Sequence, residues 1–327
     1  MQPSLSVLIP TYNRAATLRK VLEGLAEQTM PRDQFEIVLV DDGSTDDTAE
    51  AARQFITGSG MPLRYLRQTN RGPAAARNAA LAASSGPLVL FLGDDTIPAR
   101  DFLQQHADYH RRRNHDGRLA VVGYTTWPAG LRPTPFLRFA GEEGPQFDYA
   151  HMSPKRPLSY LQFYSSNLSI RRTLLDGLAF PFDESFTLAM WEDTELGYRL
   201  MRRGMVLHYH PQAVVYHDHP TTFAAFCRRA CQSGRVSRQL PAKHPELESD
   251  FLNAGQLRRI RRLTRPFGGL VPLVDFLDAR LRLPLPKLLY RLLLKTCYAR
   301  GATAGRQPPA IATLEADRNL ADTSCSE

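Results

Sequence analysis

Two pairs of aspartates are the first residues in this sequence whose type and spacing could do chemistry. Asp94-Asp95 directly follows the apolar run Leu88–Leu92, and Asp41-Asp42 directly follows another such run. Adjacent ionised carboxylates repel each other unless a cation is present, and Mg²⁺ or Mn²⁺ accepts carboxylate, diphosphate and water oxygens. A turn with helix-capping aspartates is the alternative for either pair alone. Two pairs at neighbouring strand ends favour a Mn²⁺ or Mg²⁺ site.

A second acidic cluster, Glu192 and Asp193, lies at the start of a helix predicted over Trp191–Arg203. Carboxylates at this position are favoured by the helix dipole, so a purely structural role is the alternative to catalysis. Four histidines follow, at positions 208, 210, 217 and 219. A zinc site is one interpretation, but alternation along a strand sends side chains to one face without making them converge. We therefore expect His208 and His210 to be structural.

Strands and helices alternate through the first hundred residues, as expected for an α/β fold with a mostly parallel sheet and right-handed crossovers. Helical spacing occurs over Ala15–Gln28 and Pro73–Ala83, and Thr45 or Asp46 could cap the helix after the turn Asp41–Asp47. Short apolar runs predict strands at Leu5–Pro10, Phe35–Val40, Leu63–Arg67 and Leu88–Leu92.

Ligands of such sheets bind beyond the carboxyl ends of the strands. Three polar clusters fall at these predicted ends, namely Thr11–Arg14, Asp41–Ser44 and Asp94-Asp95. We therefore expect their side chains to share one edge of the sheet and to form the functional site.

The middle of the chain changes character. Residues 127–160 are rich in proline and glycine without clean periodicity, which predicts a long loop acting as a lid or substrate-binding segment. Regular structure resumes with strands expected at Asn167–Ile170, Val206–Tyr209 and Ala213–His217.

Four ordered motifs resemble the family 2 glycosyltransferases, which have the GT-A fold, a Rossmann-like sheet flanked by helices. The resemblance covers roughly residues 4 to 220, and its motifs are Ser6–Arg14, Val38–Asp46, Asn70–Asn78 and Phe91–Pro98. It implies a nucleoside-diphosphate sugar donor in the first half of the domain and transfer to a hydroxyl acceptor with inversion. The acceptor would be a glycan or glycolipid of the cell envelope.

The resemblance also implies residue roles. Pro10, Thr11 and Tyr12 would border the nucleoside, and Asp42 beside Asp41 would reach the base or ribose. Two cations could approach the donor, Arg14 and Arg77, although Arg77 could instead pair with Asp41 or Asp42 and organise the site.

The metal and the base are assigned by the same resemblance. Asp95 matches the metal-ligating acid and Asp94 its partner, although Gly93 stands where the commonest form of the motif has a further acid. His217 is expected to complete the metal shell, with His219 as the alternative. Asp193 would take the proton from the acceptor hydroxyl, with Glu192 supporting it.

Charge divides the chain at about residue 220. Residues 1–220 hold 23 Lys/Arg and 24 Asp/Glu, whereas residues 221–327 hold 18 and 9. We expect a catalytic domain over 1–220 and a basic amphipathic helical extension over 221–327, with a disordered last stretch. The runs Arg258–Arg262 and Lys287–Lys295 fit either a helix on an anionic membrane or apolar faces packed on the catalytic domain. Binding of nucleic acid is less expected, because few aromatic residues that could stack on bases lie among the basic runs.

The remaining sequence signals concern location. Met1–Pro10 lacks a basic region typical of a signal peptide, and no apolar stretch reaches about 18 residues, so we expect no membrane-spanning helix. All four cysteines lie in the last third without a zinc-site spacing, as expected for free thiols in a reducing compartment. These signals favour a cytoplasmic protein, peripheral at most on the inner face of the plasma membrane.

Three other classes of protein are less consistent with the sequence. A nucleotidyltransferase would carry a glycine-rich basic loop after the first strand, and Thr11–Ala16 contains no glycine. A dehydrogenase is disfavoured because G-x-G-x-x-G is missing there. A degenerate fold kept as a membrane- or partner-binding module would not need the four aspartates 42, 94, 95 and 193 together.

Overall fold

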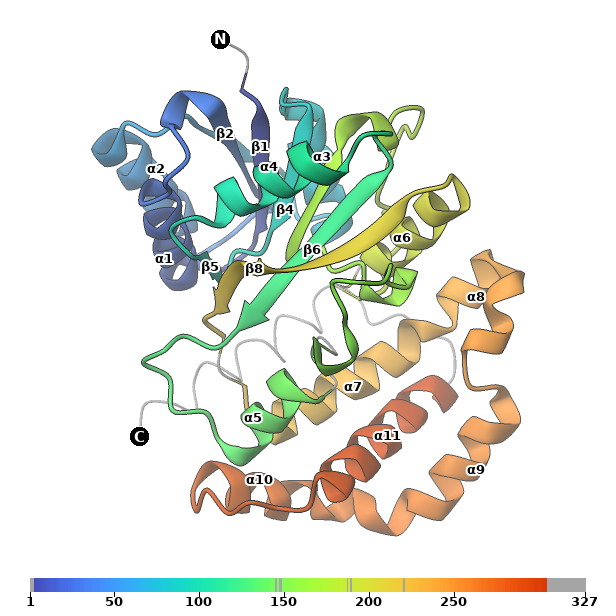
Figure 1. The fold of residues 1–327 in the computed structure, drawn as a ribbon. Coiled ribbons are helices and arrows are strands. Elements are labelled where there is room, and N and C mark those ends of the chain that lie inside the picture. The colour runs from blue at the N-terminus through green and yellow to red at the C-terminus, as the bar shows by residue number, and fades with distance from the viewer. Residues whose placement is uncertain are drawn as a thin grey trace. The chain divides into compact units, whose positions relative to one another are not determined.

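The computed structural model describes residues 3–144, 146, 149–186, 188, 190–219 and 221–304. The chain forms two compact units, coloured by residue number in Figure 1. Unit 1 consists of Met1–Arg132 and Gly141–His219, and unit 2 of Pro133–Ala140 and Pro220–Glu327. The second passage of the chain from unit 1 to unit 2 lies between His219 and Pro220. The segment Pro133–Ala140 was expected in the catalytic domain and belongs to unit 2 instead.

Unit 1 is built on one eight-stranded sheet in the order β3-β2-β1-β4-β7-β6-β8-β5. The first four strands are parallel, β7 runs antiparallel to β4 and β6, and β5 runs antiparallel to β8. The strands are β1 (Leu5–Thr11), β2 (Phe35–Asp41), β3 (Leu63–Arg67), β4 (Leu88–Leu92), β5 (Thr96–Pro98), β6 (Leu119–Thr126), β7 (Asn167–Arg171) and β8 (Val206–His217).

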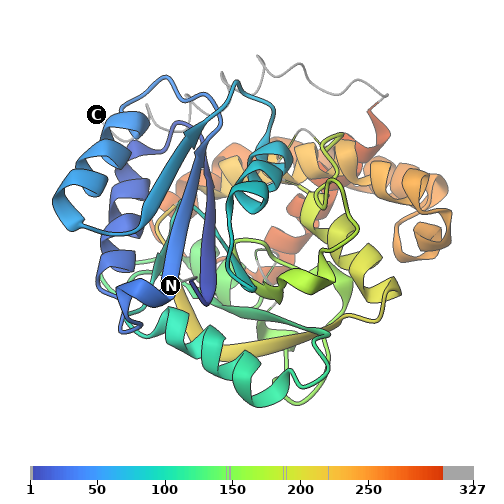
Figure 2. The same ribbon diagram turned by 90° about the horizontal axis from the view of Figure 1, so that it is seen from above.

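Helices cover both faces of this sheet because its central strands are apolar on both sides. Val7 and Ile9 of β1 join one core with α1 (Ala15–Ala26), α2 (Thr48–Ser59) and α4 (Phe102–Arg113). Leu8, between them, points to the opposite core, which holds α3 (Pro73–Ala83) and α6 (Glu192–Arg202). Figure 2 shows α1 and α2 on one side of the strands and α3 and α6 on the other. The predicted α/β fold is confirmed.

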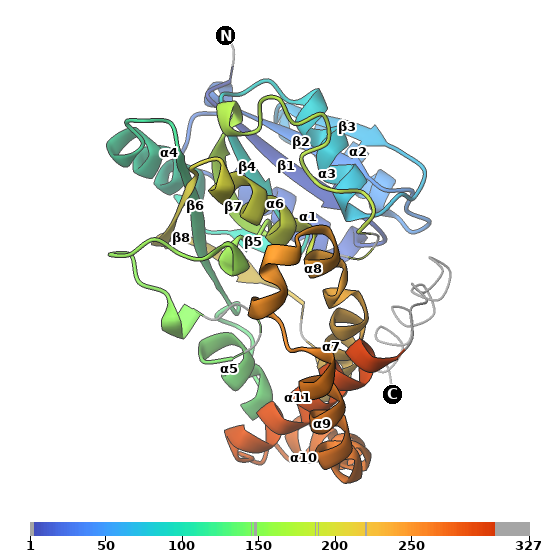
Figure 3. The same cartoon turned by 90° about the vertical axis from the view of Figure 1, so that its right-hand side faces the viewer.

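Unit 2 is helical. α11 lies between α7 and α9, as Figure 1 shows, and Figure 3 gives the same helices from the side. Gly234 and Gly301 allow α7 and α11 to approach closely, since a Cβ on Gly301 would lie 1.8 Å from the Cys231 carbonyl oxygen. The helices are α5 (Pro135–Glu142), α7 (Phe223–Ser237), α8 (Gln239–Lys243), α9 (Ala254–Thr264), α10 (Val271–Ala279) and α11 (Lys287–Thr303).

Two expectations about local structure were wrong. Residues 127–160 contain the helix α5, whose Phe136 packs edge-on against Phe223 and Phe226 of α7. The two short strands expected after residue 205 are one strand, β8, with an irregularity opposite Gly123 and Tyr124 of β6. A proline at position 211 interrupts the apolar pattern there without ending the strand.

The described residues also bear on the expected absence of a membrane span and on the cysteines. No helix in the described ranges is long and apolar enough to cross a bilayer. Cys227, Cys231 and Cys297 are free thiols. The expected disorder of the last stretch and Cys325 lie outside the described residues.

Candidate active site

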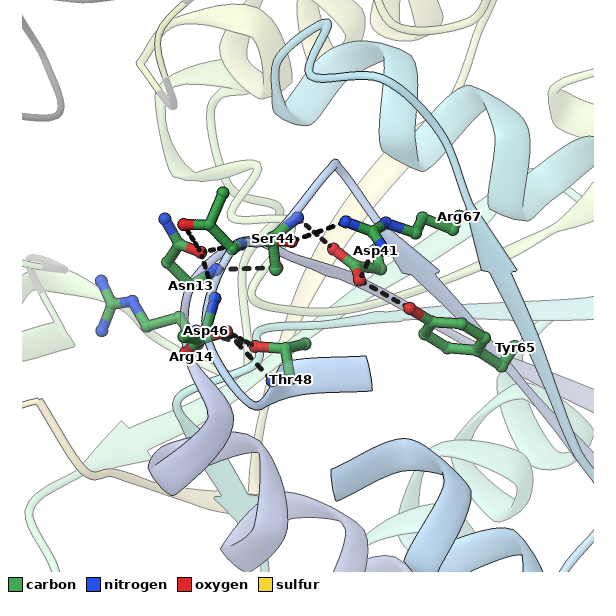
Figure 4. A network of polar contacts seen from close by, with 9 residues as sticks. Asn13, Arg14, Asp41, Ser44, Asp46, Thr48, Tyr65 and Arg67 are labelled. Carbon is green, nitrogen blue, oxygen red and sulfur yellow. Dashed lines mark hydrogen bonds and ion pairs between the residues drawn. The ribbon is translucent and has the colours of Figure 1, made fainter. Parts of the chain in front are cut away.

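The end of β1 is tied to the loop after β2 by side chain–backbone hydrogen bonds (Figure 4). Asn13 has a left-handed φ of 51°, which asparagine tolerates, and its Oδ1 accepts from the Thr45 amide at 2.7 Å. The Asp46 carboxylate accepts from the first amides of two helices, Ala15 at 3.1 Å and Thr48 at 3.0 Å. The N-cap of α2 is Asp47, so neither Thr45 nor Asp46 is the cap, although Asp46 accepts from the first amide of the helix. These contacts fix Pro10, Thr11 and Tyr12 at the edge of the sheet.

Asp41, the last residue of β2, is fully buried. Its carboxylate accepts from the Ser44 amide at 2.7 Å and from the Tyr65 hydroxyl at 2.6 Å, and Arg67 Nε lies 3.9 Å away. Burial and the adjacent carboxylate raise the pKa of Tyr65, so the phenol stays protonated and donates. Asp41 therefore connects the end of β2 to the following turn and to Tyr65 of β3.

Asp42 faces the start of α3. Its carboxylate accepts from the amides of Arg71 and Gly72 at 2.9 and 2.8 Å and from the Gln68 side chain at 2.7 Å. Burial raises the pKa of this carboxyl in spite of these bonds. A hollow of about 530 Å³ is lined by Gly43, Arg67, Gln68, Thr69 and Asn70, and two of these side chains reach the aspartates, Arg67 near Asp41 and Gln68 on Asp42.

Arg77 does not pair with Asp41 or Asp42, so that interpretation of its structural role was wrong. Its Nη1 lies 2.7 Å from Oε1 of Glu192, and both side chains are nearly buried, at 11% and 2% exposure. Arg77 thus links α3 to the acidic cluster at the start of α6. No spacing in the sequence signals this pair, because the partners lie more than a hundred residues apart.

Asp95, beyond the end of β4, lies among cationic and aromatic side chains. Its Oδ2 is 3.5 Å from His217 Nε2 and 3.7 Å from Arg14 Nη1, while Arg14 also contacts His219 Nδ1 at 2.9 Å. Burial raises the pKa of Asp95, but His217 and Arg14 outweigh burial and hold it below its ordinary value. Trp127 lies against the His217 ring, with centroids 5.6 Å apart.

The side chains around Asp95 offer few ligands to a metal ion. Within the described ranges, no three His, Cys, Asp or Glu side chains gather closely enough to hold a metal by themselves. Asp95 and His217 nevertheless offer one carboxylate and one imidazole at a single point, next to Asp94 in the chain. Mg²⁺-like ions commonly take one or two carboxylates and complete their shell with substrate phosphates and water. The donor set fits such an ion.

Asp193 lies at the start of α6, after Trp191, whose left-handed φ of 73° turns the chain into the helix. Its Oδ2 accepts from the amide and hydroxyl of Ser165 at 3.3 and 3.4 Å, and its Oδ1 accepts from the Thr194 amide at 2.8 Å. Burial, opposed by Arg77 and reinforced by Asp193, raises the pKa of Glu192 to about 7.

Ser165 connects the two acidic clusters. It precedes β7, whose first residue, Asn167, pairs with Leu92 at the end of β4. The Gly93 amide donates to the Ser166 carbonyl at 3.1 Å. Since Asp94 and Asp95 follow Gly93, the start of β7 brings Asp193 and Asp95 to the same edge of the sheet. Ser165 escaped sequence reasoning because a lone serine in a loop carries no signal.

His208 and His210 lie away from this edge. Tyr109 of α4 contacts His208 Nδ1 at 3.2 Å, and Gln105 of α4 contacts His210 Nε2 at 3.1 Å. Both histidines therefore join β8 to a helix, in the structural role expected for them. The four histidines do not converge on one ion.

The parallel half-sheet with its acidic carboxyl edge defines a GT-A fold. A mannosyltransferase from Pyrobaculum calidifontis in complex with GDP-Man and Mn²⁺ has the same fold, with a TM-score of 0.55 at 23% identity over 99% of this chain and 82% of that one. S. aureus TarS 1–349 in complex with UDP gives 0.53 at 20% identity over 92% and 89%.

The family model for glycosyl transferase family 2 matches residues 6–174, and the chain belongs to this family. A validoxylamine A glucosyltransferase of Streptomyces hygroscopicus subsp. jinggangensis is 31% identical over 62% of this chain and 52% of its own length. A pre-mycofactocin glycosyltransferase of Mycobacterium tuberculosis is 27% identical over 76% and 50%. The chain thus spans about half the length of these curated relatives.

Proposed function

We propose that this protein transfers a sugar from a nucleoside-diphosphate sugar to a hydroxyl acceptor, with inversion and with the help of Mn²⁺ or Mg²⁺. The observation that carries the proposal is the convergence at one sheet edge of Asp95, with His217 and Arg14, and Asp193, held by Ser165. A charge-stabilising group and a proton acceptor at one edge are the two elements that such a transfer requires.

The donor would lie along the ends of β1 and β2. The hollow is bordered by Arg67, which lies near Asp41, and by Gln68, which donates to Asp42. Pro10, Thr11 and Tyr12 end the neighbouring strand. Thr11 Oγ1 is buried and has no hydrogen-bond partner among the described residues, which leaves it available to a ligand. The nucleotides named for the two similar structures support a nucleoside diphosphate.

Asp95, Asp94 and His217 would hold the metal ion. The ion supplies positive charge that stabilises the departing nucleoside diphosphate. Arg14 adds a further cation at the same place, since its guanidinium already lies beside the Asp95 carboxylate. The Mn²⁺ named with the Pyrobaculum calidifontis mannosyltransferase supports this assignment.

Asp193 is proposed as the general base. The acceptor oxygen forms a bond to the anomeric carbon as the bond from that carbon to the phosphate oxygen breaks, and the acceptor proton passes to Asp193. Hydrogen bonds from Ser165 and Thr194 fix the carboxylate, and the Glu192–Arg77 pair supports the helix start beneath it. Inversion follows from this single displacement.

The acceptor class is a hydroxyl of a glycan or glycolipid used in building the cell envelope. Support comes from the basic residues of unit 2, since residues 221–304 hold 16 Lys/Arg against 5 Asp/Glu. This balance suits work at an anionic surface on the cytoplasmic side, where lipid-linked acceptors are available.

The experiment is a donor screen with a metal test. The chain would be incubated with UDP- and GDP-sugars, and its melting temperature and donor hydrolysis followed with Mn²⁺, with chelator, and after Mn²⁺ is restored. Ligand binding to the folded state should raise the melting temperature. We expect hydrolysis to vanish in chelator and to return with Mn²⁺.

Single substitutions in the same screen test which residues bind the metal and the donor. Asp95→Asn should weaken the response to metal and donor together. Asp108→Asn is the matched control, since Asp108 pairs with Arg111 on α4 away from the edge. Full hydrolysis in chelator would refute metal dependence. Formation of nucleoside triphosphate and sugar 1-phosphate when pyrophosphate is added to the donor, without release of nucleoside diphosphate, would indicate a nucleotidyltransferase.

A further inference from the structure

Exposed large apolar side chains are concentrated in one part of unit 2. Of the nine in the described chain, seven fall within residues 263–288. They are Leu263 (58%), Phe267 (40%), Leu273 (53%), Phe276 (53%), Leu281 (53%), Leu283 (44%) and Leu288 (77%). Single exposed leucines are ordinary, but a cluster of this kind marks an interaction site.

In α10, the buried residues and the exposed residues lie on different faces of the helix. Val274 and Asp278, one turn apart, are buried, and the Asp278 carboxylate accepts from the Phe136 amide at 2.7 Å and the Tyr290 hydroxyl at 2.8 Å. Leu273 and Phe276, also one turn apart, lie on another face and are half exposed. The inward face of α10 is thus already used, and the outward face is apolar.

Charge on this surface has one sign. Its two acids are engaged within unit 2, since Asp278 is buried and Asp275 accepts from the Ala224 amide at 2.8 Å. Eight basic side chains are exposed: Arg258, Arg259, Arg261, Arg262, Arg265, Arg280, Arg282 and Lys287.

The second basic run, Lys287–Lys295, does not form an independent amphipathic face. Tyr290, Leu293 and Leu294 are buried in unit 2, where α11 packs against α7. Lys287, Arg291 and Lys295 are exposed on the opposite side of α11, and of this run only Lys287 and Leu288 adjoin α10 in the chain. The two basic runs, which look alike in the sequence, therefore have different roles.

We propose that residues 258–288, here called the α9–α10 face, dock on an anionic lipid bilayer. The leucine and phenylalanine side chains enter the interfacial region, and the arginines contact lipid phosphates. Each basic residue near an anionic surface strengthens binding roughly fivefold, so eight are ample for reversible binding. Nucleic acid suits the charge but leaves seven apolar side chains without partners. An anionic bilayer offers acyl chains to the apolar residues and phosphates to the basic residues.

The test measures binding of the full chain to vesicles, without donor or metal. Vesicles of phosphatidylcholine alone are compared with vesicles in which part of this lipid is replaced by phosphatidylserine. We expect binding only to the anionic vesicles, and weaker binding as salt is raised. Equal binding to neutral vesicles, or no binding to either kind, overturns the proposal.

Double substitutions test whether the α9–α10 face is the surface that binds the vesicles. Leu273→Glu/Phe276→Glu and Arg261→Gln/Arg262→Gln should each reduce binding by roughly tenfold or more. The controls are Phe180→Glu, an exposed apolar residue of unit 1, and Arg111→Gln/Arg112→Gln on α4. Melting temperatures show that every variant folds. Unchanged binding by both face variants overturns the proposal.

Two outcomes identify other occupants. If the full chain fails to bind but a chain ending at Ala304 does, the chain's own last residues cover the face and the proposal is wrong. Self-association lost in Leu273→Glu/Phe276→Glu, without vesicle binding, would assign the face to a second copy. Donor hydrolysis is measured separately, so failure of docking and failure of the proposed catalysis are distinguishable.

Discussion

Both carboxylate oxygens of Asp193 accept hydrogen bonds, so the side chain is held in one orientation before any acceptor arrives. Asp193→Asn keeps its size but cannot take up the acceptor proton. We expect the transfer rate to fall by roughly 10²–10⁴, the usual contribution of a general base, with donor affinity nearly unchanged. Steady-state rates over a range of donor concentrations check this. A parental rate in this variant would remove Asp193 from the mechanism and make Glu192 the next candidate.

Glu192 gives a prediction about pH and stability. Burial raises its pKa from an ordinary value of 4.5 to about 7 in the folded chain. Between these two values the folded chain holds a proton that the unfolded chain has released. The stability contributed by this proton is therefore complete below pH 4.5 and is lost as the pH rises through about 7.

Melting temperatures between about pH 5 and 8 measure this loss as a downward slope. Glu192→Gln should lack this component of the slope, because its amide does not titrate. The exposed carboxylate of Glu248 is the control, and Glu248→Gln should keep the parental slope. Identical pH profiles for the parent and Glu192→Gln would show that Arg77 outweighs burial.

The sequence located the aspartates of the site because they directly follow apolar strands, where local pattern decides position. It could not find partners that meet only through tertiary packing. Arg77 was expected to approach the donor or, as the alternative, to pair with Asp41 or Asp42, and the structure pairs it with Glu192. Ser165 carried no signal because its role depends on where β7 begins beside β4.

At the scale of elements, the close contact between α7 and α11 is the most sensitive feature of unit 2. A Cβ on Gly301 would lie 1.8 Å from the Cys231 carbonyl oxygen, and one on Gly234 would lie 2.1 Å from that of Tyr298. Since backbone atoms cannot give way as a side-chain end can, Gly301→Ala should cost about 1–3 kcal/mol or more. Denaturant unfolding measures the change.

Gly58→Ala in α2 is the control for helix propensity. A Cβ there meets nothing within 4 Å, so this variant should gain up to about 1 kcal/mol. A Gly301→Ala protein as stable as its parent would mean that α7 and α11 separate at little cost.

Elements with strong periodicity were predictable, and those defined by distant partners were not. The strands β1, β2 and β4 are continuous apolar runs and were found to within a residue or so. The helix α5 was not predicted among the prolines and glycines, because its Phe136 packs against Phe223 and Tyr290, which lie far later in the chain. β8 was split in two, since its polar middle residues bond to α4 and not to a core.

At the scale of the whole molecule, the chain enters unit 2 twice, because Pro133–Ala140 belongs to this unit together with the residues after His219. Phe136 contacts Phe223, Phe226 and Tyr290, all beyond residue 219. A fragment ending at His219 should therefore expose this phenylalanine and aggregate. The same fragment with Pro133–Ala140 replaced by glycine and serine should stay soluble, because unit 1 keeps its own sheet and cores. Light scattering of the two fragments checks this.

The same segment has a consequence for synthesis. Phe136 leaves the ribosome about 90 residues before Phe223 and about 150 before Tyr290, a delay of roughly 4–30 s at ordinary translation rates. All strands of unit 1 are complete by residue 217, so its sheet can form while α5 still waits for its partners. Nascent chains stalled near residue 250 should be cut by protease within residues 133–140, and chains released at full length should not. Packing of α5 would then have to wait until the helices after residue 220 have been synthesised.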